Sequence, residues 1–305
     1  MLPAAVLALV AIVVLRNRVA LVHSFEEIGW GPMAVSWAFA VAGTVALVGL
    51  WSALLRGLGT VPPRGQGWPV FFVSQLGKYV PGLLWPAVAQ MQAGHRWGAR
   101  RSVMLAANLL LVAVLVSSGV MVGLALLPWS VGVAGVSWWA WATAAALAVV
   151  CVWPGLLTRV LDALFRLVGR TPPSLAVPPA AMARAYAWAL LVWLLYGVHV
   201  VVLVRAAGGS GVDAWAAAIG GLALGWALGL VAVFAPAGLG VREAVVVASL
   251  GPVIGRSSAL AVALASRGLL ALGDVALALA GSRRAARPAS AGATPATPAS
   301  DRPDQ

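Results

Sequence analysis

Charged residues are scarce in this chain. Only 9% of its 305 residues are Asp, Glu, Lys or Arg, and 62% are hydrophobic, whereas about 25% charged residues is usual in soluble domains. Apolar runs long enough to cross roughly 30 Å of hydrocarbon recur along nearly the whole sequence. The composition excludes a soluble globular protein and predicts an all-α, polytopic transmembrane helix bundle.

Residues typical of metal, redox and hydrolytic chemistry are also few. The single cysteine, Cys151, excludes a disulfide within the chain, and the three histidines have no metal-ligand spacing. No P-loop, G-x-S-x-G or H-E-x-x-H motif occurs, and Asp162 stands alone in its loop. We therefore expect no metal, no cofactor and no enzymatic activity of this chain alone.

The positive charge has a distribution typical of membrane proteins. The net charge is +12, but the arginines lie at the ends of apolar runs and in short loops, where they follow the positive-inside rule and meet anionic lipids. No nucleic-acid partner is expected. The distribution predicts a multi-pass inner or plasma membrane protein with its N-terminus and C-terminal tail in the cytoplasm.

Hydropathy predicts seven spans and two broken segments. The spans cover 2–15, 32–55, 102–127, 138–157, 185–206, 213–234 and 258–281. Segments 68–92 and 235–256 are apolar but rich in Pro and Gly, which a continuous helix does not accommodate, so both are predicted to be broken or re-entrant. Seven spans would place the tail outside; a short eighth crossing at 243–255 would return it to the cytoplasm. The expected count is thus seven or eight.

Two cytoplasmic segments complete the predicted organisation. Residues 159–170 have basic positions three and four apart, which fits either an interfacial helix or an extension of the fourth span. A transmembrane domain is expected over 1–281. Residues 282–305 contain too few large apolar side chains to fold and are predicted to form a disordered tail.

Five charged residues are predicted at membrane depth, where a charge costs about 2.5–3.5 kcal/mol on insertion scales and normally faces a bundle interior or a wet cavity. They are Lys78, Arg242, Glu243, Arg267 and Asp274. Arg267 and Asp274 are seven residues apart on one face of the last span, roughly 10 Å along the axis. They could line one polar groove, or each could neutralise a partner on a neighbouring helix.

The chain's only lysine, Lys78, lies in the stretch SQLGKYVPG. Its ammonium could meet a phosphate, while Ser74, Gln75 and Tyr79 could bind other parts of a polar headgroup. The alternative is a lysine that snorkels from the tip of an interfacial hairpin.

In the stretch FAPAGLGVREAV, a new helix is expected to begin near Val241. Its free N–H groups and Arg242 would form an anion site, and Glu243 would either offset the helix dipole or contact a substrate ammonium.

Both motifs together resemble the membrane domain of the lysylphosphatidylglycerol synthase family, a flippase-like integral membrane family. The resemblance rests on LGKYVPGLLW, APAGLGVREAV and an arginine in the last span. It implies substrate-binding roles for Lys78, Tyr79, Pro81, Gly82, Gly238, Gly240, Arg242, Glu243 and Arg267. Ala237 departs from the glycine expected there.

The resemblance implies movement of aminoacylated phosphatidylglycerol or a related lipid between leaflets, with a phospholipid as ligand and a separate synthase or glycosyltransferase as a potential partner. Synthase activity is not implied, because no soluble domain follows the spans. Two rival hypotheses are a membrane subunit that recruits or stabilises a lipid-modifying enzyme, and a membrane enzyme acting on headgroups. The even span count in each half predicts a parallel repeat with both motifs on the cytoplasmic side.

Overall fold

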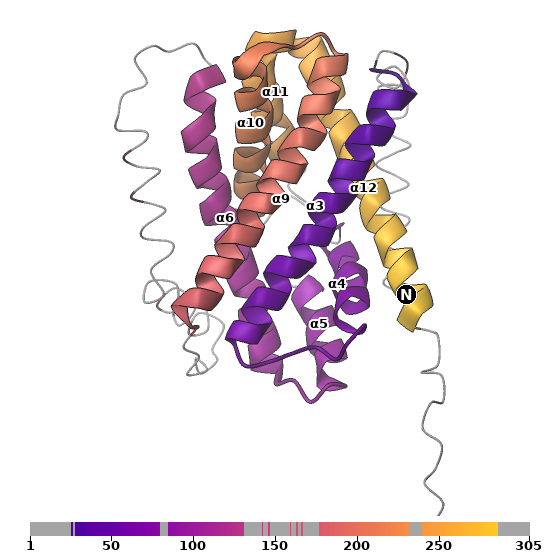
Figure 1. The fold of residues 1–305 in the computed structure, drawn as a ribbon, viewed down its shortest axis with the longest axis vertical. Coiled ribbons are helices and arrows are strands. Elements are labelled where there is room, and N and C mark those ends of the chain that lie inside the picture. The colour runs from indigo at the N-terminus through magenta and orange to yellow at the C-terminus, as the bar shows by residue number, and fades with distance from the viewer. Residues whose placement is uncertain are drawn as a thin grey trace, which may run out of the picture.

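The structure is a computed structural model that describes residues 28–79, 85–130, 177–231 and 240–285, together with the single positions 26, 142, 146, 159, 163 and 166. Within these residues the regular structure is entirely helical (Figure 1). The predicted spans 2–15 and 138–157, the segment 159–170 and the tail beyond Ala285 lie wholly or almost wholly outside this description.

Five of the described helices are long and apolar enough to cross a membrane. They match the five predicted spans that the description covers. The helices are α3 (Trp30–Gly57), α6 (Arg101–Ser130), α9 (Pro179–Ala206), α10 (Gly211–Val231) and α12 (Arg256–Ala285). The all-helical, multi-pass character predicted from the sequence is therefore confirmed. The last helix continues four residues past the predicted start of the tail.

Small residues let the long helices approach closely, as is typical of membrane bundles. Gly43 of α3 lies against the ring of Tyr196, and Gly57 lies against Ala181 near the start of α9. Positions late in α3 thus contact positions early in α9, so these two helices are antiparallel. Gly119 and Gly123 of α6 lie in the same way against α10.

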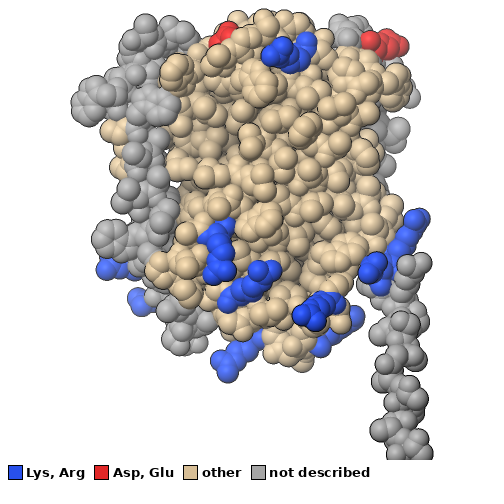
Figure 2. Space-filling view, viewed as in Figure 1, with Lys and Arg blue, Asp and Glu red and all other residues tan. Residues whose placement is uncertain are grey.

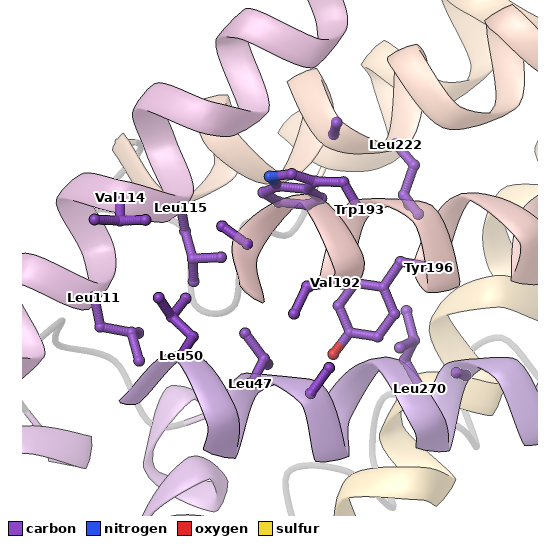
Figure 3. Packing of buried hydrophobic residues seen from close by; sticks show 14 of the residues in the cluster. Leu47, Leu50, Leu111, Val114, Leu115, Val192, Trp193, Tyr196, Leu222 and Leu270 are labelled. Atoms are coloured by element: carbon purple, nitrogen blue, oxygen red, sulfur yellow. The ribbon is translucent and has the colours of Figure 1, made fainter. Parts of the chain in front are cut away.

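Large side chains fill the space between these close helix contacts (Figure 3). The view shows Leu50 of α3 and Leu115 of α6 facing Val192 and Trp193 of α9, with Leu270 of α12 on the other side of Tyr196. Leu50, Val192 and Tyr196 are almost completely buried. The core is continuous across the long helices, so residues at mid-height of the bundle are screened by protein on several sides.

The predicted break in segment 68–92 is present. The chain forms α4 (Gly67–Gln75), the 3-10 turn η1 (Leu76–Tyr79) and, after residues 80–84, α5 (Trp85–His95). A Cβ on Gly77 would lie 2.9 Å from the backbone nitrogen of Pro86, so the close approach of the two arms requires glycine there. We call residues 67–95 hairpin A.

The second broken segment begins its helix at the predicted position. Helix α11 (Val241–Ile254) starts at Val241 and runs antiparallel to α10. Gly225 lies beside Arg242, Gly221 beside Ser249, and Gly209, just before α10, beside Ile254. The start of α10 and the end of α11 therefore lie at the same end of the bundle. We call residues 211–254 hairpin B.

The prediction of a parallel repeat is wrong. Hairpin A begins where α3 ends, and hairpin B begins where α9 ends, and α3 and α9 are antiparallel. Figure 1 shows α4 and α5 at the lower end and α11 at the upper end. The order α3, hairpin A, α6 recurs upside down as α9, hairpin B, α12. The prediction took hairpin B as a crossing followed by a separate segment, whereas α11 runs back along α10.

Arginines mark one end of the bundle. Figure 2 shows most basic side chains on the lower half of the visible face, with a largely uncharged band above them. Those at the end where α3 and α12 finish and α6 and α9 begin are Arg56, Arg64, Arg96, Arg100, Arg101, Arg184, Arg283 and Arg284. The opposite end has Arg205 and Arg256 with the acidic Glu26 and Asp213. The loop 58–66 and the end of α12 thus share the arginine-rich end.

Candidate functional site

All five charged residues predicted at membrane depth meet near the middle of the bundle. Lys78 lies in η1, at the inner end of the first arm of hairpin A, and Arg242 and Glu243 lie in the first turn of α11. Arg267 and Asp274 each lie eleven residues from an end of α12. We call these five residues the central cluster. It forms where the inner ends of the two hairpins meet α12.

The first interaction joins hairpin A to α12. The Nζ atom of Lys78 lies 2.6 Å from Oδ2 of Asp274, and the hydroxyl of Tyr79 donates a hydrogen bond of 2.6 Å to the same oxygen. The Asp274 side chain is 1% exposed and that of Lys78 is 20% exposed. The other oxygen, Oδ1, is buried and has no hydrogen-bond partner among the described residues. One carboxylate oxygen therefore holds two groups of hairpin A while the second has none.

The second interaction joins hairpin B to α12. Glu243 Oε1 accepts a short charge-assisted hydrogen bond from Nη1 of Arg267. Its Oε2 accepts a bond of 2.7 Å from the backbone N–H of Gly240, the residue that caps α11. Gly240 has a φ of 84°, which explains the glycine. Glu243 thus binds the backbone at the start of α11 and also makes an ion pair.

Arg242 is the cation without a carboxylate partner. It is 9% exposed, and within the described residues its side chain makes no ion pair or hydrogen bond. Its guanidinium lies 4.9 Å from the ring centroid of Trp226 in α10. The ammonium of Lys78 lies 5.7 Å from the same ring. Trp226 is therefore shared between the two hairpins.

Tyr196 supports Trp226 from α9. The two rings stack with centroids 5.7 Å apart and an interplanar angle of 20°. The Tyr196 hydroxyl points toward α3 (Figure 3) and lies 3.0 Å from Oγ1 of Thr44. The indole N–H of Trp226 is buried and has no acceptor in the described part of the chain. A stacked aromatic pair thus holds the cationic side of the cluster against α3 and α9.

Of the two interpretations for Arg267 and Asp274, the pairing found is with neighbouring elements. Arg267 binds Glu243 of hairpin B, and Asp274 binds Lys78 of hairpin A. The two ion pairs therefore lie along the same helix, α12. Each carboxylate faces a cation of the protein, because a buried charge is tolerated only when it is paired.

Ser74 and Gln75 differ in their surroundings. Ser74 is buried and accepts a bond of 2.8 Å from Gln90 Nε2 of α5, while Gln90 Oε1 accepts one of 2.5 Å from Asn108 of α6. This chain joins the two arms of hairpin A to α6. Gln75 is half-buried, and no hydrogen bond connects its side chain to other described residues.

His199 forms a separate buried junction close to the cluster. It is 0% exposed; Nδ1 lies 2.6 Å from Oγ of Ser36 on α3, and Nε2 lies 2.9 Å from Oγ of Ser266 on α12. Both ring nitrogens thus have partners. The junction fixes α12 just before Arg267.

The remaining predicted site residues, Pro81, Gly82 and Gly238, lie outside the described residues. Sequence reasoning also missed several uncharged members of the site, because uncharged residues were considered only within the two motifs. These are Thr44, Gln90, Asn108, Tyr196, His199, Trp226 and Ser266. Polar or aromatic residues in the middle of an apolar run, rather than near its ends, would have identified most of them.

Comparison with known proteins assigns no family: no family model and no curated protein matches this chain.

Proposed function

We propose that this protein moves a phospholipid, or a lipid-linked headgroup, between the leaflets of the inner or plasma membrane. The observation that carries the proposal is the central cluster, which gathers five charges near the middle of a bundle that contains five long apolar helices. Such charges are expensive in hydrocarbon and mark substrate pathways when they lie inside a bundle. A charged headgroup crossing the membrane needs compensating groups at this depth.

The arrangement of the hairpins supports the same proposal. Inverted repeats with broken helices are the usual framework of membrane transporters, with the substrate near the midplane between the repeats. Here we propose that hairpins A and B are re-entrant from opposite faces. The free N–H groups at the start of α11 point into the same region and favour an anion. By the positive-inside rule the arginine-rich end is cytoplasmic, which places the tail there too.

The resemblance in the two motifs suggests the flippase-like domain of the lysylphosphatidylglycerol synthase family as the family of this chain, with an aminoacylated phosphatidylglycerol as one ligand class. That assignment is part of the proposal.

Vesicle transport tests the proposed function. Purified protein is reconstituted with trace lipids that carry a fluorophore on one acyl chain, and loss of fluorescence after an impermeant quencher is added reports movement to the outer leaflet. We expect wild type to exceed protein-free vesicles, and Lys78→Ala and Glu243→Ala to lose most of the gain. Arg205→Ala, at the distant end of α9, is the matched control and should retain it. Absence of movement in folded wild-type protein for every lipid would reject the function.

The pairing of the charges favours one alternative. Because Lys78 and Arg267 already bind carboxylates, the cluster could fix the architecture of a non-transporting subunit that recruits a lipid-modifying enzyme. The alternative predicts that the enzyme's membrane activity depends on this chain and survives Lys78→Ala. Co-expression with the candidate enzyme and assay of its product distinguish the two.

A further inference from the structure

The central cluster has one positive charge more than it has negative charges. Its cations are Lys78, Arg242 and Arg267, and its carboxylates are Glu243 and Asp274. The adjoining sequences 80–84 and 232–239 contain no charged residue. Each carboxylate is paired with one cation, so the excess charge resides on Arg242.

The compensation of Arg242 is incomplete. Its guanidinium is almost buried and contacts the face of Trp226, and a cation–π contact replaces only part of the hydration lost on burial. The Trp226 N–H is a second donor, buried and without an acceptor. Two donors without acceptors thus belong to one contact. Phosphate oxygens suit both, because guanidinium binds phosphate through parallel hydrogen bonds.

We propose that the central cluster selects a phospholipid headgroup with a net charge of −1, namely a phosphodiester with an uncharged alcohol, over zwitterionic and cationic headgroups. The inference rests on the proposed function and specifies its substrate. Phosphate binding at Arg242 leaves both ion pairs intact and makes the cluster neutral. This differs from the aminoacylated lipid that the motifs suggest.

Headgroups that carry an ammonium fit the cluster less well. A zwitterionic headgroup leaves the excess positive charge in place, and lysylphosphatidylglycerol, with two amines and one phosphate, increases it. Among the described residues, the only buried carboxylate oxygen without a partner is Oδ1 of Asp274, and that carboxylate already binds Lys78 and Tyr79. An additional ammonium therefore competes with Lys78.

The test compares three lipids in one neutral phosphatidylcholine background, each labelled on an acyl chain so that its headgroup is unmodified. They are phosphatidylglycerol, phosphatidylethanolamine and lysylphosphatidylglycerol. We expect initial rates to fall in that order, with phosphatidylglycerol roughly tenfold faster than phosphatidylethanolamine because an uncompensated buried charge is costly. Equal rates, or lysylphosphatidylglycerol fastest, overturn the inference and leave the proposed function standing. No movement of any lipid rejects the function itself.

Substitutions locate the selection at Arg242. Arg242→Gln removes the excess charge, so the ratio of phosphatidylglycerol to phosphatidylethanolamine rates should fall to about one, whereas a purely structural role would lower both rates together. Arg205→Gln is the matched control, because its guanidinium also lies over a tryptophan, Trp215, at 6.0 Å, but outside the cluster. Its ratio should equal that of wild type.

A milder variant decides the matter if Arg242→Gln does not fold. Trp226→Phe keeps an aromatic face for the cation but removes the N–H donor. We expect it to slow phosphatidylglycerol more than phosphatidylethanolamine. An unchanged ratio in folded Trp226→Phe protein contradicts the proposal.

Discussion

Asp274 is the residue on which the interactions of hairpin A converge. One of its oxygens binds both Lys78 and Tyr79, and the carboxylate is almost wholly buried in the middle of α12. A buried carboxylate is tolerated when a cation is paired with it, and it destabilises the fold when that cation is removed. The pair is therefore asymmetric, because the Lys78 side chain is partly exposed to solvent whereas the Asp274 side chain is not.

Removing Lys78 should destabilise the protein more than removing both partners. Lys78→Met leaves Asp274 buried with Tyr79 as its single donor, and we expect a loss of about 3 kcal/mol in the free energy of unfolding. Lys78→Met combined with Asp274→Asn should recover more than half of that loss. Chemical unfolding in mixed micelles, followed by tryptophan fluorescence, measures both. A double variant less stable than Lys78→Met would contradict the buried ion pair.

Gly240 provides a test of backbone strain free of steric contacts. A Cβ there would meet nothing within 4 Å, but the residue has a φ of 84°. Gly240→Ala should destabilise the protein by about 1–2 kcal/mol. Gly31→Ala, also with open space around its Cβ and in helix α3, is the control and should be neutral or stabilise by up to about 1 kcal/mol. Equal melting-temperature shifts in detergent would refute the strain argument.

At the scale of elements, the seam between α3 and α9 positions the cationic side of the cluster. Tyr196 touches Gly43, binds Thr44 and stacks on Trp226. A change on α3 is therefore transmitted through one rigid ring to the residue that Arg242 covers. A second glycine contact with an aromatic ring on the same helix, between Gly49 and Trp188, has no such continuation, because Trp188 is 38% exposed.

The two glycines form a matched pair for testing this seam. Gly43→Ala would overlap the buried Tyr196 ring and should cost about 1–3 kcal/mol by overpacking. Gly49→Ala would overlap Trp188, which can swing outward, so its cost should be smaller. Thermal unfolding gives the two stabilities, and lipid movement should fall only in Gly43→Ala. The same loss in both variants would show that Tyr196 has no special coupling to the site.

The sequence predicted well the positions of helices, which depend on hydropathy, and predicted poorly which charged side chains pair with one another. The five described spans and the start of α11 follow from apolar length and from the Pro-Gly break. The partners of Arg267 and Asp274 do not, because the interval of seven residues fits both a shared groove and two separate neighbours. His199 and Asn108 were missed because uncharged residues outside the two motifs were not considered as site residues.

At the scale of the whole molecule, the arrangement is that of two halves related by inversion. The halves α3, hairpin A, α6 and α9, hairpin B, α12 run in opposite directions. Hydropathy could not reveal this, because α10 is long enough to be counted as a span although α11 leads the chain back to the end where α10 began. The direction of hairpin B depends on tertiary contacts such as that between Gly221 and Ser249.

Accessibility labelling tests the inverted arrangement. In a background with Cys151 replaced by serine, single cysteines are introduced as Arg64→Cys, before hairpin A, and Ser210→Cys, before hairpin B; both positions are exposed. An impermeant thiol reagent should label them from opposite sides of the membrane. Arg284→Cys, at the exposed end of α12, should label with Arg64→Cys. Labelling of Arg64→Cys and Ser210→Cys from the same side would contradict the inverted arrangement and support a parallel repeat.

The position of α12 at the end of the described chain has a consequence for biosynthesis. Lys78 and Glu243 both depend on this last helix for their partners, so they enter the bilayer during translation before their counter-charges exist. Each unpaired charge weakens insertion of its segment. Ribosome-bound chains that stop short of Arg256 should therefore remain associated with the insertion machinery, and should be released into the bilayer once α12 emerges. Helix α12, the last of the described helices, would then serve as the checkpoint for insertion of the two hairpins.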